Sequence, residues 1–488
     1  MKFFDRDKEL RTLSQIWKAV VEGKFNFIVI TGRRGVGKTR LLFEFSRQNN
    51  INMVYLFVEK KEIDTLLTKF VNRLEKVIHK KIPKVKTIED FLVLLENMSA
   101  TQSLLIVFDE FQNFRYCNKA IFSRFQEFVD RMKYKDTAKM MVVVIGSMIG
   151  MLREIFESEE SPLYGRKTSE IFLKPFEFWE IRSLLKEIGL TSEEEIIEVY
   201  SMLGGMPRYY DNIDRLSLKI NRNTVIEFFT TRTYPGWKEV RNELIEEFKD
   251  AHITYFSILE AISMGNTTSN EISGYTGILE KSIHKYLNEL TNYFQIIEKR
   301  IPALAPKTYR GARYYITDPF YRFWFRYIFP NIDLIEIEQS KQLQNEIKKD
   351  LPNHVAGIFE EIVRRTLLKI SGRRINGIEI PIVNQVCNWW DRKGNEVDIV
   401  GVWRKKVQLI GEIKWKNKPF NYSDLEKFIR KLELLKAKNV LIIIVSKEGF
   451  TPSAKSYIEE KNGLALTLKQ LTRIWNMIET PEKNLGTQ

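Results

Sequence analysis

The chain has 488 residues, of which 44% are hydrophobic, and its 77 Lys and Arg against 63 Asp and Glu give a net charge of +14 at pH 7. This length predicts three or four domains, and the hydrophobic content excludes a chain that is disordered throughout. The only two cysteines, Cys117 and Cys387, lie far apart. Their spacing excludes a disulfide scaffold and a thiolate zinc site, and it fits a reducing compartment.

The excess of positive charge points to an anionic partner, with nucleic acid as the leading candidate and an acidic membrane surface as the second. No apolar run reaches the ~20 residues that span a bilayer, and the charged start MKFFDRDKEL lacks the apolar core of a signal peptide. We therefore expect a cytoplasmic protein that does not enter a membrane. The histidines form no ligand cluster and are expected at the surface or at helix caps: His79, His252, His284 and His354.

The first region, residues 1–175, alternates short apolar runs with longer helical patterns. Each run is nearly continuous in apolar residues, which is typical of parallel strands that are buried on both faces. The four runs are residues 27–31, 54–58, 104–108 and 141–145. This alternation predicts an α/β domain built on a parallel sheet.

Four further regions are expected after this domain. The first, residues 176–250, is mostly helical and is broken by the sequence GGMP; we expect it to form a lid. Three helical patterns and two strand patterns follow in residues 251–330, and residues 331–351 are polar enough for a helical linker. The last region, residues 352–475, again mixes helices with strands.

A phosphate-binding motif follows the first apolar run. The sequence GRRGVGKT satisfies the pattern GxxxxGK[ST] between a strand and an amphipathic helix. Backbone N–H groups of such a loop converge on phosphate oxygens, and the helix N-terminus adds a positive dipole end. Lys38 is expected to reach the β- and γ-phosphates, and Thr39 to offer its hydroxyl to Mg²⁺. The expected nucleotide contacts are Gly32, Arg33, Arg34, Gly35, Val36, Gly37, Lys38 and Thr39.

Two carboxylates end the third apolar run. Asp109 and Glu110 follow the sequence LLIVF, which places them at the C-terminal end of a buried strand. Ligands of open α/β sheets bind at that edge. We expect Asp109 to hold Mg²⁺ through water and Glu110 to polarise the attacking water. The sequence therefore predicts that ATP is bound and hydrolysed here.

Several motifs resemble those of the archaeal-type ATPase family, which is related to AAA+ ATPases. They are FFDRDKELRTL, GRRGVGKT, LLIVFDEFQ, VVVIGS, SPLYGR and GGMPRYY, and they cover residues 1 to about 215. The resemblance implies that Ser147 is a polar sensor that orients the water or the γ-phosphate. It also implies that Arg166 is an arginine finger completing a neighbour's site in a homo-oligomer, and that Arg208 is a second sensor coupled to the lid. For both arginines the alternative is a surface ion pair.

The region that follows the lid has the element order of a winged helix. Its third helical pattern, residues 278–293, would be the recognition helix, with Ile283, Leu287 and Leu290 in the core. Side chains suited to phosphates and base edges then face outward: Lys281, His284, Lys285 and Asn288. We expect this module to bind double-stranded DNA. Packing against the ATPase or another subunit is the alternative.

The loop between the two expected strands, residues 295–298 and 314–317, is basic and contains no acidic residue. Such a wing is suited to gripping the DNA backbone. Its expected DNA contacts are Lys299, Arg300, Lys307, Arg310 and Arg313. The aromatic run that follows, residues 320–329, has the spacing of a buried helix rather than of a base-stacking surface.

The last region has the αβββαβ order of the restriction-endonuclease-like PD-(D/E)XK core. The expected elements are a helix at residues 354–370, strands at 378–386, 396–403 and 407–415, a helix at 423–436 and a strand at 440–446. Asp398 falls in the second strand, and Glu412 and Lys414 share one face of the third. We expect Asp398 and Glu412 to bind Mg²⁺ and Lys414 to position water or stabilise charge on phosphorus.

A carboxylate of the preceding helix often completes such sites, and Glu360 is a better candidate than Glu361. The region, roughly residues 315–470, also resembles the DUF234 domain that accompanies these ATPases, including DPFYRFWFRY at its start. The sequence as a whole predicts an ATPase that binds DNA and cleaves nucleic acid. The alternatives are a nucleotide-regulated DNA-binding switch whose nuclease-like domain does not cut, and a chaperone-like ATPase acting on protein.

Overall fold

The computed structural model describes residues 2–234, 236–306, 308–435, 437 and 439–479. The chain divides into two compact units. The first unit comprises Met1–Pro175 with Met206–Asp211, and the second comprises Phe176–Gly205 with Asn212–Gln488. Among the helices in these described ranges, none is both long enough and apolar enough to cross a membrane.

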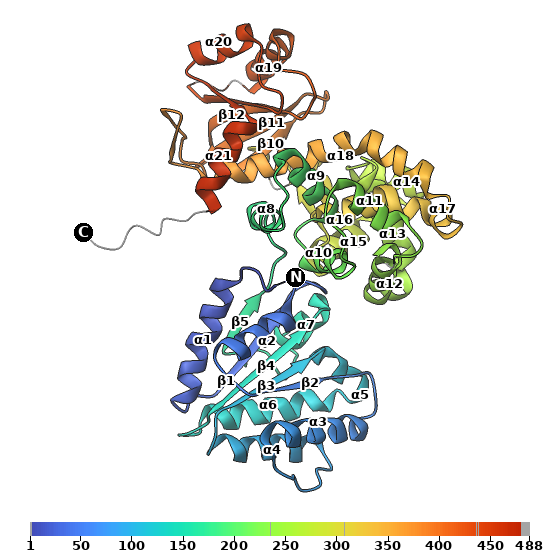
Figure 1. Ribbon diagram of the computed structural model, residues 1–488, viewed down its shortest axis with the longest axis vertical. Coiled ribbons are helices and arrows are strands. Elements are labelled where there is room, and N and C mark those ends of the chain that lie inside the picture. Colours follow the sequence, from blue (N-terminus) through green and yellow to red (C-terminus); the bar gives the residue numbers. More distant parts are fainter. Residues whose placement is uncertain (1, 235, 307, 436, 438, 480–488) are drawn as a thin grey trace, which may run out of the picture. The chain divides into compact units, whose positions relative to one another are not determined.

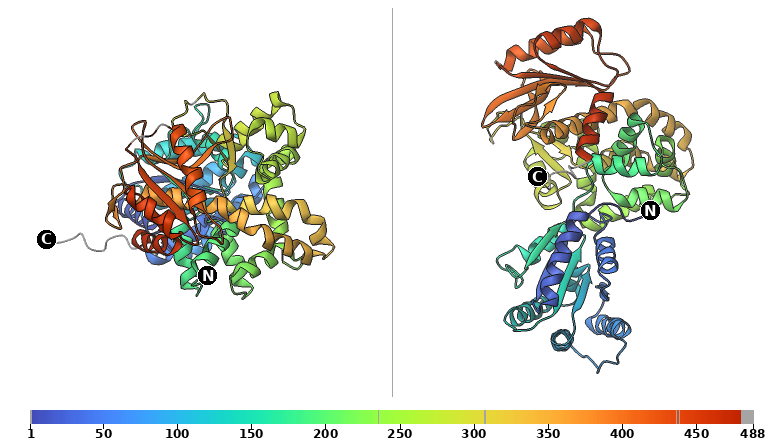
Figure 2. Two further views of the ribbon diagram at one scale, coloured as in Figure 1. Left: turned by 90° about the horizontal axis from the view of Figure 1, so that it is seen from above. Right: turned by 60° about the vertical axis from the view of Figure 1, so that its left-hand side comes forward.

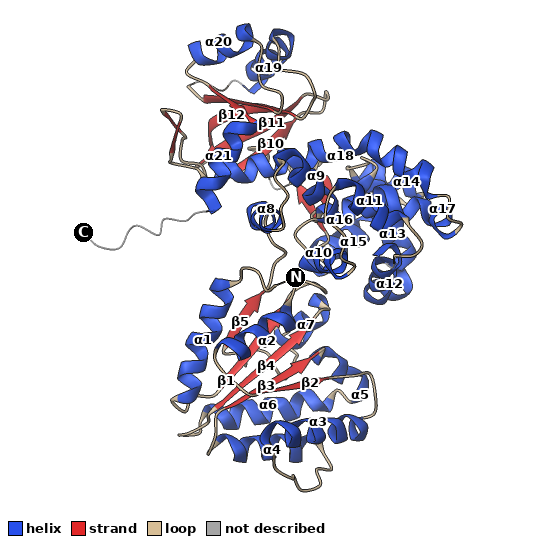
Figure 3. Ribbon diagram, in the orientation of Figure 1, coloured by secondary structure: helices blue, strands red, loops and turns tan. Residues whose placement is uncertain are grey.

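The first unit is built on a five-stranded parallel sheet in the order β2-β3-β4-β1-β5 (Figures 1 and 3). Its strands are β1 (Asn26–Thr31), β2 (Met53–Phe57), β3 (Leu104–Asp109), β4 (Met140–Gly146) and β5 (Ser169–Phe172). The first four match the predicted runs to within two residues. The short edge strand β5 was not predicted, because only Ile171 among its residues is buried.

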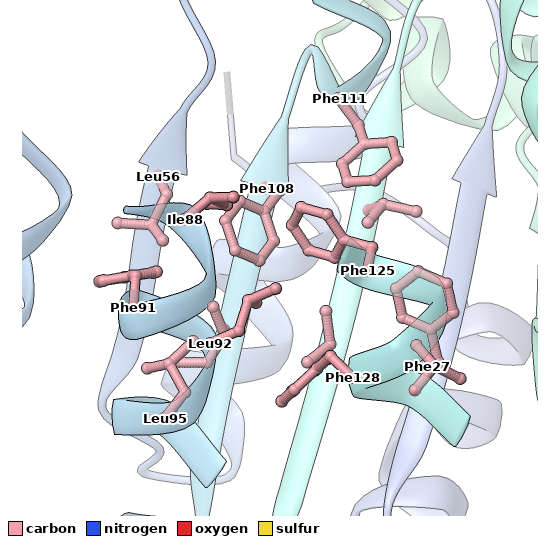
Figure 4. Close-up of a cluster of buried hydrophobic side chains, with 14 of the residues drawn as sticks. Phe27, Leu56, Ile88, Phe91, Leu92, Leu95, Phe108, Phe111, Phe125 and Phe128 are labelled. Carbon is pink, nitrogen blue, oxygen red and sulfur yellow. The ribbon is translucent and has the colours of Figure 1, made fainter. Parts of the chain in front are cut away.

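Seven helices precede residue 175 in the first unit: α1 (Asp7–Val21), α2 (Lys38–Gln48), α3 (Ile63–Ile78), α4 (Ile88–Ser99), α5 (Phe114–Cys117), α6 (Ala120–Lys133) and α7 (Ile149–Phe156). One face of the sheet packs against α3, α4, α6 and α7 in a cluster rich in phenylalanine, which includes Phe70, Phe108, Phe111 and Phe125. Figure 4 shows the rings of Phe108, Phe111 and Phe125 in this cluster. Phe108 and Phe125 meet edge to face with centroids 5.3 Å apart. This core fixes the end of β3, where the predicted acidic pair lies.

The second unit begins with helices and a small hairpin. Its helices before the hairpin are α8 (Phe178–Glu187), α9 (Glu193–Leu203), α10 (Pro207–Arg215, whose first five residues belong to the first unit), α11 (Arg222–Thr230), α12 (Gly236–Phe248), α13 (His252–Ser263), α14 (Ser269–Thr276) and α15 (Glu280–Asn288). The hairpin is formed by β6 (Ile297–Arg300) and β7 (Arg313–Ile316). After it come α16 (Pro319–Phe323), a π-helical turn Trp324–Ile328 and α17 (Ile332–Glu336). The aromatic run is buried, as predicted.

A mixed five-stranded sheet ends the second unit, in the order β10-β11-β12-β13-β14. Its strands are β10 (Gln385–Trp390), β11 (Glu396–Trp403), β12 (Lys406–Lys414), β13 (Leu441–Ser446) and β14 (Leu464–Thr467). The helices are α18 (Ser340–Lys369), α19 (Tyr422–Leu435), α20 (Pro452–Glu460) and α21 (Leu468–Glu479), and a two-residue hairpin pairs β8 (Arg374–Ile375) with β9 (Ile378–Glu379). The chain therefore has the predicted α/β fold class, with a parallel ATPase-type sheet and a C-terminal sheet domain.

The structure differs from the prediction in the linker. Residues 340–351 are the first part of the 30-residue helix α18, which continues through Pro352 and runs from the helical group to the C-terminal sheet (Figure 2). Leu343, Ile347 and Leu351 of this segment are buried. Its polar composition hid an apolar stripe that packs at helical spacing, so the segment is part of the packed unit.

Two smaller expectations were also wrong. The strand predicted at residues 378–386 is split between β9 and β10, with Ile380 buried between them. His354 is buried rather than exposed, and its Nε2 lies 2.8 Å from the carbonyl oxygen of Ser201. Burial lowers the pKa of His354 to about 4, so the ring is neutral at pH 7.

Candidate nucleotide site and a second carboxylate site

The phosphate-binding loop lies at the carboxyl edge of the parallel sheet, between β1 and α2. Helix α2 begins at Lys38, and Gly37 precedes it with φ of 100°, a conformation that a residue with a Cβ rarely adopts. The Nζ of Lys38 donates to the carbonyl oxygens of Gly32 and Arg33 at 2.7 and 3.2 Å, which holds the ammonium inside the loop. The first backbone N–H groups of α2 and the Lys38 charge therefore share one site for an anion.

Asp109 ends β3 next to this loop. The hydroxyl of Thr39 donates to Oδ2 of Asp109 at 3.1 Å, so the two expected Mg²⁺ contacts are in direct contact. A hydroxyl beside a buried carboxylate is a donor set that suits Mg²⁺, which prefers oxygen ligands. Burial raises the pKa of Asp109, and a bound cation would reverse that effect.

Tyr55 is a residue of this site that the sequence did not reveal. It lies on β2, which pairs with β3, and its hydroxyl donates to the same Oδ2 of Asp109. Burial and this hydrogen bond raise the pKa of Tyr55, so the phenol stays protonated. A tyrosine on the strand beside the acidic strand was the available signal, but strand order is not readable from the sequence.

Glu110 lies in a left-handed conformation with φ of 55° directly after β3. The hydroxyl of Ser147, which follows the neighbouring strand β4, donates to both carboxylate oxygens of Glu110 at 2.9 and 3.2 Å. The side-chain amide of Gln112 also donates to this carboxylate. The structure thus brings the predicted sensor and the predicted water-polarising carboxylate together.

The two arginines with predicted roles at the nucleotide site, Arg166 and Arg208, lie in different surroundings. Arg208 packs on the phosphate-binding loop, because a Cβ added to Gly35 would lie 2.7 Å from its Cδ. Arg166 instead pairs with Asp130 at 3.2 Å and donates to the carbonyl oxygen of Tyr164 at 2.9 Å. Arg208 is therefore next to the predicted nucleotide site of its own chain, and Arg166 makes the ion pair that was its alternative.

The second carboxylate site lies on one face of the C-terminal sheet. Strands β11 and β12 pair with Val400 opposite Ile410, so Asp398 and Glu412 share that face. Oδ2 of Asp398 accepts from the backbone N–H of Ile413 at 2.9 Å. From α18, Arg364 donates to the Glu360 carboxylate at 3.3 Å and to the carbonyl oxygen of Asp398 at 3.1 Å. The structure therefore brings Glu360 to the site.

Two lysines bind the Glu412 carboxylate, which is almost fully buried. The Nζ of Lys414 lies 2.6 Å from Oε1, and the Nζ of Lys431, on α19, lies 2.8 and 3.1 Å from the two oxygens. Lys431 was not predicted, because α19 is one of many charged helices in the sequence. Burial and the carboxylates of Glu360 and Glu412 raise the pKa of Asp398 above its ordinary value.

The fit of this site to Mg²⁺ is partial. The carboxylates of Glu360 and Glu412 raise the pKa of Asp398, and a divalent cation bound among the three would relieve this repulsion. In the described parts of the chain, however, no three or more His, Cys, Asp or Glu side chains are placed to hold a metal ion. The donor chemistry therefore suits Mg²⁺, whereas the side chains as placed pair Glu412 with lysines.

In the predicted recognition helix, α15 buries Ile283 and Leu287, and the π-helical turn Glu289–Tyr293 that follows it buries Leu290, in agreement with the prediction. The side chains expected on its outer face are exposed: Lys281, His284, Lys285 and Asn288. The helix before it, α14, is capped by Thr268, whose side chain accepts from the backbone N–H of Glu271. This module thus presents a compact group of polar and basic side chains.

The loop between β6 and β7 differs from a basic wing whose arginines are all available to DNA. Arg300 pairs with Glu361 at 2.7 Å, and Arg313 pairs with Glu396 at 3.0 Å while lying 4.7 Å above the Trp390 ring. These two arginines therefore neutralise carboxylates of the C-terminal part of the same unit. Lys299 and Arg310 are exposed, and Lys307 lies outside the described residues.

The loop itself is packed on the C-terminal sheet. The N–H of Ala303 donates to the carbonyl oxygen of Asn388, and Nε1 of Trp390 donates to the carbonyl oxygen of Gly311, both at 3.1 Å. Ala303 belongs to the buried cluster that includes Val397 and Val400. The hairpin is thereby attached to the sheet that carries Asp398.

Comparison with known proteins gives the family. A model described as an ATPase domain predominantly from Archaea matches residues 3–213, and one described as archaeal and bacterial proteins of unknown function, DUF234, matches residues 324–428. The uncharacterized protein MJECL04 of Methanocaldococcus jannaschii is 31% identical over 436 residues, which cover 88% of this chain and 91% of that protein.

Among solved structures, the Walker-type ATPase PABY2304 of Pyrococcus abyssi is similar with a TM-score of 0.51 and 20% identity, over 66% of this chain and 96% of that one. This likeness supports the fold. The chain therefore belongs to the family of archaeal ATPases in which the P-loop ATPase domain is joined to a DUF234 domain.

Proposed function

We propose that the first unit binds ATP with Mg²⁺ and hydrolyses it. The observation that supports this proposal is the convergence of Lys38, Asp109 and Glu110 at one edge of the parallel sheet. Thr39 and Asp109 would hold Mg²⁺, which would neutralise charge on the phosphates. Lys38 would bind the β- and γ-phosphates, and Glu110, oriented by Ser147, would accept a proton from the attacking water.

The test of this proposal is the substitution Lys38→Ala. We expect nucleotide affinity to fall about 10- to 100-fold, because a charge-assisted hydrogen bond to phosphate is lost. Hydrolysis should fall with it. Binding is measured with a fluorescent ATP analogue and hydrolysis by phosphate release. Unchanged binding by this variant would contradict the assignment of the loop.

Arg208 would sense the nucleotide through its contact with the loop at Gly35. Arg166 would act as a finger only in a homo-oligomer in which it leaves Asp130. The domain limits proposed from the sequence assign residues 1–175 to the ATPase core and residues 176–250 to the lid. They assign residues 251–330 to a winged helix and 352–475 to the nuclease-like domain.

We further propose that the second unit binds DNA through α15. The supporting observation is the exposed group Lys281, His284 and Lys285 on a helix whose opposite face is buried, in a chain of net charge +14. Lys299 and Arg310 would extend this surface. Arg300 and Arg313 are left out of it, because both are paired with carboxylates within the unit.

A second candidate function is cleavage of nucleic acid at the second carboxylate site. The observation that favours it is the convergence of Asp398, Glu412 and Lys414 with Glu360. The three carboxylates would hold Mg²⁺, which would polarise a phosphodiester. Lys414 would then leave Glu412 to stabilise charge on phosphorus. Without cleavage, the same chain would be a nucleotide-regulated DNA-binding switch.

One experiment separates these proposals. Plasmid and linear DNA are incubated with the protein, Mg²⁺ and ATP, and both gel shifts and products are followed over a range of salt. The double variant Lys281→Glu, Lys285→Glu should weaken DNA binding about tenfold or more and lower the salt dependence, because phosphate contacts are lost. Lys341→Glu, Lys348→Glu, which changes the same charge on the exposed side of α18, is the control.

The same assay tests cleavage through Glu412→Ala. Products that appear with the unsubstituted protein and disappear with this variant would support cleavage. Products that persist would come from another site or a contaminant. A gel shift without cleavage products would support the nucleotide-regulated DNA-binding switch. The absence of a salt-sensitive gel shift would contradict DNA binding.

A further inference from the structure

Gln112 occupies an unusual position beside Glu110. It lies in the 3-10 turn Phe111–Asn113, and its side chain is completely buried. Its Nε2 donates to the Glu110 carboxylate, whereas its Oε1 has no hydrogen-bond partner in the described structure. That oxygen lies against Gly146, where an added Cβ would be 2.2 Å from it.

This arrangement costs free energy twice. A buried carbonyl oxygen without a partner loses its hydration and gains nothing in return. The left-handed backbone of Glu110, with φ of 55°, is a second unfavourable feature at the neighbouring residue. An apolar side chain of the same size at position 112 would avoid the first cost, so stability alone does not account for a glutamine.

The amide orientation follows from its neighbours. Turning the amide over would place Oε1 against the Glu110 carboxylate, where two acceptors would repel each other. The donor therefore faces Glu110 and the oxygen faces the glycine of β4. The hydroxyl of Ser147 donates to the same carboxylate, at 2.9 Å from Oε1 and 3.2 Å from Oε2.

We propose that Gln112 is a positioning residue for ATP hydrolysis: together with Ser147, it fixes the orientation of the Glu110 carboxylate toward the attacking water. This inference rests on the proposed function, in which Glu110 accepts the proton of that water. The proton passes from the water to Glu110, the new bond joins the water oxygen to the γ-phosphorus, and ADP leaves. Gln112 takes part in none of these steps and acts only through the position of the carboxylate.

The test is the substitution Gln112→Met, which keeps the length of the side chain and removes both the donor and the unpartnered oxygen. We expect kcat to fall about tenfold or more, because a displaced base costs up to about 100-fold in rate. ATP affinity should stay within about twofold, and the urea midpoint should be unchanged or higher. Gln102→Met, the same change at an exposed position before β3, is the matched control.

A structural role would produce a different pattern. If Gln112 only supported the fold, Gln112→Met would lower the urea midpoint and leave the kcat of the folded fraction unchanged, which would overturn the inference. A wild-type rate in a stable variant would overturn it as well. Glu110→Gln gives the rate without the base, and Gln112→Met should lie between this value and the wild type.

The substitution Gln112→Glu should alter the pH dependence of kcat, which a change in side-chain packing alone would not do. Two adjacent buried carboxyl groups share one proton, and the protonated form of the new side chain can donate to Glu110. The kcat of this variant should therefore be partly restored at acid pH and fall as pH rises, relative to the wild-type profile. A profile identical in shape to that of the wild type would count against positioning. If the wild-type protein itself hydrolyses no ATP, the proposed function fails and this inference fails with it; loss of the inference alone leaves wild-type hydrolysis intact.

Discussion

Replacing Glu110 by Gln is expected to lower ATP turnover by about 100-fold or more while ATP affinity stays within about twofold. The amide keeps the shape of the side chain but cannot accept the proton of the attacking water, and general bases contribute about 10²- to 10⁴-fold. The amide oxygen can still accept from Ser147, whereas the amide nitrogen cannot accept from Gln112. Single-turnover phosphate release and equilibrium nucleotide binding measure the two effects separately.

The matched control is Glu127→Gln, which removes a carboxylate that pairs with Arg124 on the exposed side of α6. This variant should turn over ATP at the wild-type rate. Equal turnover by Glu110→Gln and the wild type would show that another group accepts the proton. Loss of binding in Glu110→Gln would indicate instead that Glu110 holds the nucleotide.

A second large effect is expected for Glu361→Gln, which should destabilise the second unit by about 3–5 kcal/mol. The Glu361 carboxylate binds Arg300 of the hairpin at 2.7 Å and Arg322 at 2.5 Å, and all three side chains are largely buried. Removing its charge takes away the carboxylate that two largely buried guanidinium groups share, and leaves Arg300 with Glu298 alone. Urea unfolding followed by tryptophan fluorescence measures the loss.

The pH dependence has a defined sign. The guanidinium groups of Arg322 and Arg300 hold the pKa of Glu361 well below its ordinary value. A depressed carboxyl pKa stabilises the folded state above the unfolded value of about 4.3, and this contribution is lost as the pH falls toward the folded pKa. The Glu361→Gln variant should lack this acid-dependent component.

Glu459→Gln serves as the control for this effect. It removes an exposed ion pair with Lys455 on α20, at 3.6 Å, and should change stability by less than about 1 kcal/mol. A loss below about 1 kcal/mol for Glu361→Gln would mean that the arginines find other partners. The hairpin would then not depend on this carboxylate for its attachment to α18.

Most of the fold could be predicted from patterns of neighbouring residues in the sequence. Strands β1 to β4 were predictable because each is a continuous apolar run, and α2 because a glycine-rich motif precedes an amphipathic helix. The exposed face of α15 followed from the helical spacing of Ile283 and Leu287. Where charged residues obscured an apolar stripe, as in the first part of α18, the same reasoning predicted a helical linker; the helix is present, but its apolar stripe is packed.

The residues of the candidate sites also fall into two groups, those that local motifs predicted and those that they did not. Lys38, Thr39, Asp109 and Glu110 stand in motifs whose spacing is set by one loop and one strand end, so these candidate residues could be predicted from the sequence. The side chains that hold them are distant or hidden: Tyr55 reaches Asp109 from another strand, and Lys431 reaches Glu412 from a helix. No periodic signal marks such partners.

The P-loop motif, the acidic pair and the order of elements were therefore predictable from the amino-acid sequence, because neighbouring residues dictate these through hydrogen bonding and apolar spacing. The three-dimensional packing was needed to show that Arg300 and Arg313 bind carboxylates of their own unit and that Gln112 donates to Glu110. Charges and amides find partners through space, and the nearest partner is set by how strands and helices pack.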